Sequence, residues 1–312
     1  NKLNLNRIRD LVSKKIVNTT GFSSCLVAVA NAIGEIKAKA EKKTFSQIIR
    51  QEVINSSISL YASGGMIFEN QKYESLIEEA LMFKEQKFIG WKFRPKSPIK
   101  YLSHRSRSKN PPPFNLKEFI SFTKKLRLAV GNNFKLMVDF GSRCSNIRET
   151  IYILDFLKEI DFFFVEEPLK TNLRDYIKLK NLKKKYPIAT GEFFYDLKEI
   201  NKWINSKAVN TYQFDTNMIE YNMLFKLSKK IKNLGFNLIP HNWYNLINNN
   251  TNISFLNSGV TKNKIIEYNI LKNPFKDIFI NNMYKIKDGK IVLKNHSGLG
   301  IKLNNTIIKK FI

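Results

Sequence analysis

The sequence has few cysteines and no long apolar run. Cys25 and Cys144 are the only cysteines in 312 residues, and two distant thiols do not make the disulfide framework of a small secreted protein. We therefore expect a reducing, cytoplasmic setting. No apolar run approaches the roughly 20 residues of a membrane helix, so we expect no membrane partner. Segment 24–34 is apolar but short and lacks a cleavage-site context, which predicts a buried helix and no signal peptide.

Acidic residues are also scarce. The 26 aspartates and glutamates stand against 53 lysines and arginines, which gives a formal net charge of +27. Three explanations remain open: compositional drift in a chain rich in Lys, Asn, Ile and Phe, steering of an anionic small substrate, or binding of nucleic acid. The lysines are scattered, and the sequence has no zinc-ligand spacing, no P-loop and no aromatic-basic motif. Drift is therefore favoured, and nucleic acid is the least favoured partner.

Six ionisable residues close short apolar runs at a nearly constant interval. They are Asp139, Glu166, Glu192, Asp215, His241 and Glu267, separated by 27, 26, 23, 26 and 26 residues. A strand, a helix and two loops take about this length. Each of the six is thus predicted at the carboxyl end of a strand, where barrels of alternating strands and helices carry their active sites.

The apolar segments predict eight strands with helices between them. The expected strands cover residues 58–65, 87–93, 134–139, 161–166, 187–192, 210–215, 236–241 and 264–268. Such alternation is typical of a parallel sheet, and eight units favour a closed α/β structure, a (β/α)8 TIM-type barrel over residues 57–284. Residues 1–56 are predicted to form a reduced, mainly helical capping domain, with residues 285–312 packed near it. Segments 287–293 and 297–303 are expected to form a short terminal hairpin.

Residues 95–114 interrupt this rhythm. The segment is rich in proline and basic residues, which predicts an irregular loop on the catalytic rim, directly after the second strand. A role in substrate access and a disordered insertion both remain open. Within the segment, His104, Arg105 and Arg107 are weak candidates for substrate contact.

The first three of the six residues suggest a metal site. Asp139, Glu166 and Glu192 are carboxylates on successive predicted strand ends, where they would repel one another. A hard divalent cation resolves such repulsion, and Mg²⁺ prefers oxygen ligands. The alternative is that each acid caps a helix or pairs with a lysine. For three successive acids on one rim, a shared Mg²⁺ site is the favoured hypothesis.

Asp215 and His241 suggest a catalytic base. An aspartate one strand before a histidine can reach the imidazole, fix its tautomer and raise the basicity of the far nitrogen. Isolated histidines are more often structural than catalytic. This one follows Pro240 at a strand end in a chain with only three histidines, which favours function.

In order and spacing, these motifs resemble the enolase superfamily, and within it the mandelate racemase subgroup. The motifs are Lys92-Phe93-Arg94, VDF with Asp139, VEEP with Glu166, TGE with Glu192, QFD with Asp215, PH with His241 and IE with Glu267. The segments YASGG at 61–65 and SGLGI near the end fall in register. The resemblance covers roughly residues 10–305; each motif is weak alone, and their order is what is specific.

The resemblance implies removal of the proton α to a carboxylate, with Mg²⁺ stabilising the resulting enediolate. Asp139, Glu166 and Glu192 would be the metal ligands, and His241 with Asp215 the base. Glu267 would face the other side of the substrate carboxylate and share a proton with it. This requires Glu267 to be protonated at least transiently, which burial near other acids would favour. The resemblance also implies a homo-oligomer, because barrels of this subgroup tend to assemble.

Two departures from the family pattern shape the hypothesis. Family members often have a second lysine as a base where this chain has Arg94, and a guanidinium stays protonated. Lys92 is then expected to stabilise charge on the substrate, which leaves His241 as the base. The family cap normally starts with a three-stranded meander, whereas this sequence starts in segments resembling the helices after it. Gly141 also stands where Asn is frequent.

These observations favour a Mg²⁺-dependent lyase that dehydrates a sugar acid, a small hydroxy-carboxylate, to a 2-keto-3-deoxy acid. A racemase, epimerase or cycloisomerase of the same superfamily is the second hypothesis, with Lys92 as the base if strand two were shifted. The third is a catalytically silent barrel that acts as a binding or scaffold protein.

Overall fold

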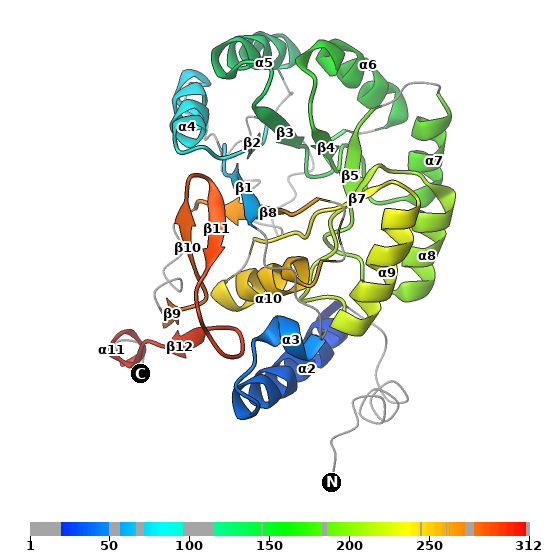
Figure 1. Ribbon diagram of the computed structural model, residues 1–312. Helices are drawn as coiled ribbons and strands as arrows, with labels where there is room; N and C mark the ends of the chain where they lie inside the picture. Colours follow the sequence, from blue (N-terminus) through cyan, green and yellow to red (C-terminus); the bar gives the residue numbers. More distant parts are fainter. Residues whose placement is uncertain are drawn as a thin grey trace.

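The computed structural model describes residues 20–49, 57–66, 72–95, 115–144, 146–182, 186–243, 245–259, 261, 263–271 and 278–309. It is a (β/α)8 barrel in which the helices lie outside the strands (Figure 1). The barrel strands are β1 (Ile58–Ser63), β2 (Gly90–Phe93), β3 (Lys135–Asp139), β4 (Phe164–Glu166), β5 (Ile188–Thr190), β6 (Thr211–Tyr212), β7 (Asn237–Leu238) and β8 (Ile265–Asn269). The predicted fold class is confirmed.

Helices connect successive strands. They are α4 (Glu74–Glu85), α5 (Leu116–Val130), α6 (Ile147–Leu157) with the 3-10 turn η2 (Lys158–Ile160), α7 (Leu173–Asn181), α8 (Leu197–Ser206), α9 (Tyr221–Asn233) and α10 (Leu246–Asn257). Asparagine starts several of them, because its side-chain oxygen accepts a backbone N–H of the first turn. Asn115, Asn146, Asn172 and Asn245 do this for α5, α6, α7 and α10.

Strands β1 to β7 pair in parallel in chain order, and β1 also pairs with β8. Among the described residues, a side-chain hydrogen bond 2.8 Å long joins Asn237 on β7 to Asn263, which lies two residues before β8. The start of β1 has a further, antiparallel partner in β11 (Lys290–Leu293), where Ile58 pairs with Ile291. The C-terminal segment thus joins the barrel sheet itself.

The prediction that segments 287–293 and 297–303 pair in a terminal hairpin is wrong. Strand β11 turns back on β10 (Tyr284–Lys287), and Figure 1 shows this hairpin between α4 and α10. Its two-residue loop is Asp288–Gly289, both at positive φ (50° and 64°), the backbone that suits the twist of a tight hairpin. The segment after it forms β12 (Ile301–Leu303), which pairs with β9 (Phe279–Asn281) and leads into the short helix α11 (Asn305–Ile308).

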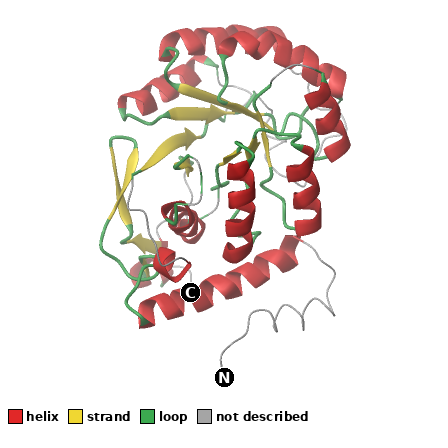
Figure 2. Ribbon diagram, turned by 45° about the vertical axis from the view of Figure 1, so that its right-hand side comes forward, coloured by secondary structure: helices red, strands yellow, loops and turns green. Residues whose placement is uncertain are grey.

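The described N-terminal part is helical, as predicted for that segment. Helices α2 (Thr20–Ala40) and α3 (Phe45–Ile49) lie at one end of the molecule near α10 (Figures 1 and 2). Glu35 accepts the backbone N–H of Leu299 at 2.6 Å, and Ser24 donates to the sulfur of Met218, which follows β6, at 3.2 Å. These helices therefore contact both the C-terminal segment and the barrel. The domain limits at residues 56 and 284 remain predictions.

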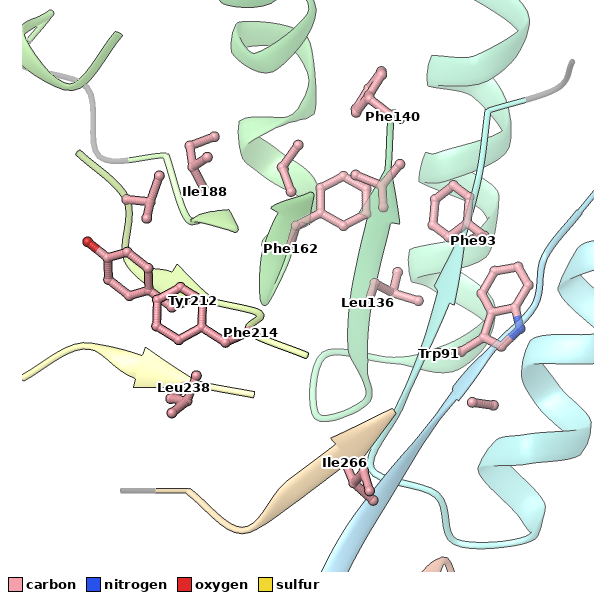
Figure 3. Packing of buried hydrophobic residues seen from close by; sticks show 14 of the residues in the cluster. Trp91, Phe93, Leu136, Phe140, Phe162, Ile188, Tyr212, Phe214, Leu238 and Ile266 are labelled. Atoms are coloured by element: carbon pink, nitrogen blue, oxygen red, sulfur yellow. The ribbon is translucent and has the colours of Figure 1, made fainter. Parts of the chain in front are cut away.

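Two apolar layers hold the barrel, because successive strand residues face opposite sides. In β3, Leu136 and Val138 point outward and pack with the helices, in the layer that Figure 3 shows around Trp91, Phe93 and Phe214. Met137 points inward. It belongs to the filling of the barrel, with Tyr61, Phe164, Ala189, Ile239 and Ile265. Asp139, two residues after Met137, faces the same way and so reaches the rim, meaning the end of the barrel where the strands finish.

No helix in the described ranges combines the length and apolarity needed to cross a bilayer. The predicted loop at residues 95–114 lies outside the described residues apart from Pro95, and so do His104, Arg105 and Arg107.

Candidate active site

The structure places the six periodic residues on the rim. Asp139 and Glu166 are the last residues of β3 and β4 and are neighbours in register. Glu192, Asp215 and His241 follow the short strands β5, β6 and β7, while Glu267 lies within β8. All six are buried except Glu192, whose side chain is 20% exposed. Their even spacing in the chain thus becomes a ring of ionisable groups in space.

Lys92 on β2 joins two of these carboxylates. Its Nζ lies 2.6 Å from Glu166 Oε2 and 2.7 Å from Glu267 Oε1, and all three side chains are at most 2% exposed. Burial would lower the pKa of Lys92, but the two carboxylates outweigh burial and hold it well above its ordinary value. In this arrangement Lys92 is a cation held by two carboxylates, suited to stabilise negative charge.

Arg94 engages the third carboxylate on this side. Its Nη2 lies 2.7 Å from Asp139 Oδ2, and its guanidinium carbon sits 4.5 Å from the centre of the Trp243 ring. The backbone N–H of Gly141 donates to Asp139 Oδ1 at 2.8 Å. Burial would raise the pKa of Asp139, but Arg94, Lys92 and this N–H together lower it. Asp139 is thus held as an anion.

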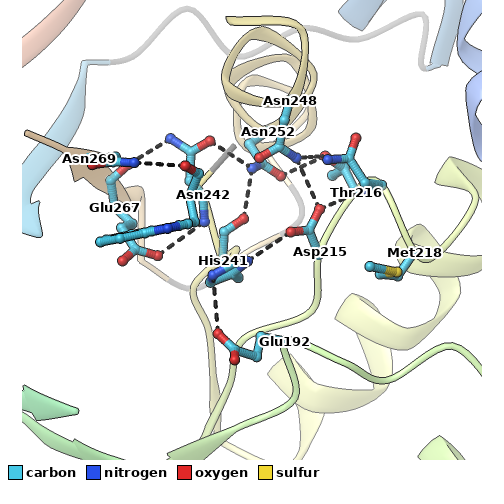
Figure 4. A network of polar contacts seen from close by, with 12 residues as sticks. Glu192, Asp215, Thr216, Met218, His241, Asn242, Asn248, Asn252, Glu267 and Asn269 are labelled. Carbon is cyan, nitrogen blue, oxygen red and sulfur yellow. Dashed lines mark hydrogen bonds and ion pairs between the residues drawn. The ribbon is translucent and has the colours of Figure 1, made fainter. Parts of the chain in front are cut away.

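His241 lies between two carboxylates. Its Nδ1 is 2.8 Å from Asp215 Oδ2, and its Nε2 is 3.1 Å from Glu192 Oε2 (Figure 4). Burial would lower the pKa of His241, but the bond to Asp215 and the charges of Glu192 and Glu267 raise it to about 10. In this arrangement the imidazole is cationic. Its Nδ1 contacts the fully buried Asp215, and its Nε2 is directed at the predicted metal ligand Glu192.

Glu267 differs from the expectation that burial would protonate it. Burial does raise its pKa, but Lys92 and His241 overcome that effect and lower the pKa to about 2. The backbone N–H of Asn242 also donates to its Oε2 at 3.0 Å. The expectation weighed the neighbouring acids and left out the cation on β2, so in this arrangement Glu267 is an anion.

The remaining carboxylates are crowded. The pKa values of Glu166 and Glu192 are each raised to about 7, first by burial and then by neighbouring acids, Asp139 among them, although Lys92 and His241 act in the opposite direction. Within the described part of the chain, no three acids, histidines or cysteines are gathered closely enough to coordinate a metal ion as they stand. Each predicted ligand instead contacts a cation of the protein.

The three predicted ligands nevertheless have the ligand chemistry that a hard divalent cation prefers. Asp139, Glu166 and Glu192 supply only carboxylate oxygens, on three consecutive strand ends, and their raised or cation-dependent pKa values show that the negative charge is costly there. A dication would offset that charge. Holding it requires the three side chains to turn from their present partners toward a common point.

Several residues of the site were not anticipated from the sequence. Glu167, the second acid of the VEEP motif, is buried at a positive φ of 40° and accepts from Thr190 Oγ1 at 2.9 Å. Trp243 supplies the ring under Arg94. Helix α10 supplies asparagines that contact the His241–Asp215 pair. Two of them, Asn248 and Asn252, are spaced four residues apart, the one sequence signal that places them on a single helix face.

Fold and rim together define a (β/α)8 barrel whose strand ends carry a histidine–aspartate pair, a buried lysine and a set of carboxylates. Residues 75–307 match the family described as "Enolase C-terminal domain-like". The chain therefore belongs to the enolase superfamily, as its motifs suggested, with the C-terminal domain of the mandelate racemase and muconate lactonizing enzyme branch.

Three known proteins illustrate the similarity. The chain is 24% identical over 287 residues to arabinonate dehydratase of Saccharolobus solfataricus, covering 91% of this chain and 70% of that protein. It is 22% identical to D-gluconate/D-galactonate dehydratase of Picrophilus torridus, covering 83% of this chain and 63% of that protein. An enolase structure from environmental sequencing of the Sargasso Sea superposes with a TM-score of 0.82 at 20% identity, over 99% of this chain and 78% of that one.

Proposed function

We propose that this protein removes the proton α to the carboxylate of a sugar acid with Mg²⁺ as cofactor, and then eliminates the β-hydroxyl to give a 2-keto-3-deoxy acid. The observation that carries the proposal is the His241–Asp215 pair on a rim where Lys92 and Arg94 are both fixed cations. His241 is the acid–base candidate once Glu192 turns to a metal ion, while Lys92 and Arg94 are suited to stabilise charge, and this combination suits elimination. The two curated relatives, both named as sugar-acid dehydratases, support the substrate class.

The residues divide the work as follows. Asp215 holds Nδ1 of His241, so Nε2 is the atom that accepts the α-proton. As the C–H electrons form the carbon–carbon double bond, the β-hydroxyl leaves and takes the proton from Nε2, which releases water. The resulting enol tautomerises to the keto acid. Lys92, which lies 2.6 Å from the proposed metal ligand Glu166, would stabilise the negative charge that develops on the substrate carboxylate.

Asp139, Glu166 and Glu192 would hold the Mg²⁺. When bound, the ion supplies Lewis-acid stabilisation of charge on carboxylate oxygens, worth several kcal/mol. Neutralising the Glu192 carboxylate would also remove one of the interactions that raise the pKa of His241. His241 would then reach its neutral, proton-accepting form at a lower pH.

Racemisation is less well supported. That hypothesis needs Lys92 as a base, with strand two shifted by two residues. In the structure, Lys92 pairs in register with Ser63 and Met137 and lies between two carboxylates, which keep it protonated. This arrangement does not favour Lys92 as the base that racemisation would need on β2.

The test is a screen of arabinonate, gluconate, galactonate and related sugar acids in D₂O with added Mg²⁺. We expect deuterium at the α-carbon or a 2-keto-3-deoxy product, detected by NMR, with at least one of them. His241→Asn should abolish both signals. His296→Asn, which alters a histidine bonded to the carbonyl of Lys294 in the C-terminal segment, should leave them unchanged. Full activity in His241→Asn would show that the base is misassigned, and an inactive wild type across the library would refute the proposal.

A further inference from the structure

Helix α10 is buried on nearly all sides and yet is polar. Its sequence LINNNTNISFLN contains five asparagines, and Asn248, Asn250 and Asn252 are fully buried. Buried amides cost free energy unless their hydrogen bonds are made. The partners of these amides therefore show why the helix tolerates them. Figure 4 shows that two of the three point to the rim residues after β6 and β7.

Asn248 contacts the aspartate of the pair. Its Nδ2 donates to Asp215 Oδ1 at 2.9 Å, and the backbone N–H of Asn217 donates to the same oxygen at 2.7 Å. The other oxygen, Oδ2, is left to receive Nδ1 of His241 at 2.8 Å. With two donors on one oxygen and the imidazole on the other, the carboxylate plane has no freedom to rotate.

Asn252, one helical turn further on, contacts the histidine itself. Its Nδ2 donates to the backbone carbonyl of His241 at 2.9 Å, while its Oδ1 accepts from Thr216 Oγ1 at 2.8 Å. Thr216 directly follows Asp215. The helix thus contacts the side chain of the residue after the aspartate and the backbone carbonyl of the histidine.

We propose that Asn248 and Asn252 are positioning residues, which orient Asp215 and His241 so that the imidazole presents Nε2 at the rim. The catalytic meaning of this arrangement rests on the proposed function, whereas the orientation of the imidazole can be measured without any substrate. The hydrogen bonds of the two asparagines reach Asp215, Thr216, Asn242 and the His241 carbonyl and not Nε2 of His241, so both would act through the pair.

Asn250 provides a matched control on the same helix. It is also fully buried, and its Nδ2 donates to the carbonyl of Leu299 at 2.7 Å and more weakly to Asn281 at 3.4 Å. The partners of its Nδ2 belong to the C-terminal segment, and its Oδ1 accepts from the neighbouring Asn249 at 3.2 Å, so none of them is Asp215 or His241. Asn248→Leu and Asn250→Leu therefore remove comparable buried hydrogen bonds, and only the first should change the histidine.

The measurement is NMR of protein labelled with ¹⁵N-histidine. The sequence has three histidines, so His241→Asn identifies the His241 signals. In the wild type we expect an Nδ1–H protected from exchange by Asp215. Asn248→Leu should broaden or shift this signal, whereas Asn250→Leu should leave it in place. On an active substrate, kcat should fall about tenfold to a hundredfold in Asn248→Leu with KM little changed, because misplacing a reacting group slows chemistry.

Asn248→Ser provides a rescue, because a hydroxyl keeps one donor toward Asp215 and removes bulk. It should restore part of the Nδ1–H signal and of kcat, and it serves as the test variant if the leucine variant does not fold. The proposal is overturned if the leucine variants at 248 and 250 give the same His241 spectrum, or if the wild type shows no protected Nδ1–H. Failure of the proposed function looks different: the spectra would change as described while no sugar acid reacts.

Discussion

The two sides of the rim are held by different interactions. On the charged side, Lys92 and Arg94 face Asp139 and Glu166 through buried ion pairs. On the amide side, Asp215 and His241 are bound by asparagines and backbone N–H groups. An ion pair is held by charge, so another cation can replace one partner. A network of amide hydrogen bonds forms only when each donor points at its acceptor, so it fixes the orientation of its members. The comparison suggests that the charged side is built to exchange partners and the amide side to keep its geometry.

The largest effect should come from the aspartate of the amide side. In Asp215→Asn the neutral amide no longer stabilises a cationic imidazole or fixes its tautomer. We expect kcat to fall about 10²–10⁴-fold, the range for losing acid–base catalysis, measured as α-deuterium incorporation. Asp196→Asn is the control, since the Asp196 side chain caps α8 by accepting the backbone N–H of Lys198. Equal losses in both variants would remove any special role of Asp215.

On the charged side, Lys92→Met should destabilise the fold. The change leaves Glu166 and Glu267 buried without their shared cation, which costs about 3–5 kcal/mol in the free energy of unfolding. Urea denaturation measures this. Lys202→Met breaks an exposed ion pair with Glu199, 3.1 Å long, and should cost at most about 1 kcal/mol. A Lys92→Met protein as stable as the control would show that the charged side does not depend on this lysine.

Magnesium should stabilise the protein more at high pH. Glu166 and Glu192 have folded pKa values of about 7, above their ordinary 4.5. Between these values the folded state binds more protons than the unfolded chain, so their contribution to stability is present at pH 4.5 and is lost as pH rises through 7. A cation replaces those protons. Mg²⁺ at tenfold its Kd should add roughly 1.4 kcal/mol near pH 8 and less near pH 5.

Scanning calorimetry with and without Mg²⁺ measures this difference. Glu166→Gln should reduce the Mg²⁺ effect, whereas Glu159→Gln, an exposed acid on η2, should not. An equal Mg²⁺ effect at both pH values, or one that persists in Glu166→Gln, would contradict a site made of these carboxylates.

The smallest effect concerns the stacking of Arg94 on Trp243. A double-mutant cycle with Arg94→Lys and Trp243→Leu should give a coupling free energy of about 1 kcal/mol, because lysine keeps the charge but not the planar contact. Urea denaturation of the four proteins gives the value. A coupling indistinguishable from zero would mean that Arg94 is held by Asp139 alone.

The strand ends could be predicted from the sequence because a barrel repeats one unit. Each strand closes with a polar residue after apolar ones, as in β3, and the interval of about 26 residues follows from the length of a strand, a helix and two loops. Successive residues of a strand face opposite sides of the sheet, so the inward direction of Asp139 and Glu166 is also predictable from their places in the strands.

The other features of the fold and the site could not be predicted, because they depend on contacts between residues that are distant in the chain. Glu267 is ionised because Lys92, distant in the chain, lies 2.7 Å away. The terminal hairpin was assigned to the wrong partners because residues 287–293 contain a turn at Asp288–Gly289, not a continuous strand. The asparagines of α10 resemble loop residues in the sequence, since only the surrounding barrel and C-terminal segment bury them.

The partners of β1 have a consequence for how the chain is made. Ser59 pairs with Ile265, and Ile58 pairs with Ile291, so the first strand stays without two of its neighbours until more than 200 further residues have been made. Contacts so distant in the chain form slowly, and an unpaired strand edge invites association with other chains. We expect the first strand to be exposed during synthesis until these distant partners arrive, which would make chaperones that shield nascent strands important for the yield of this protein.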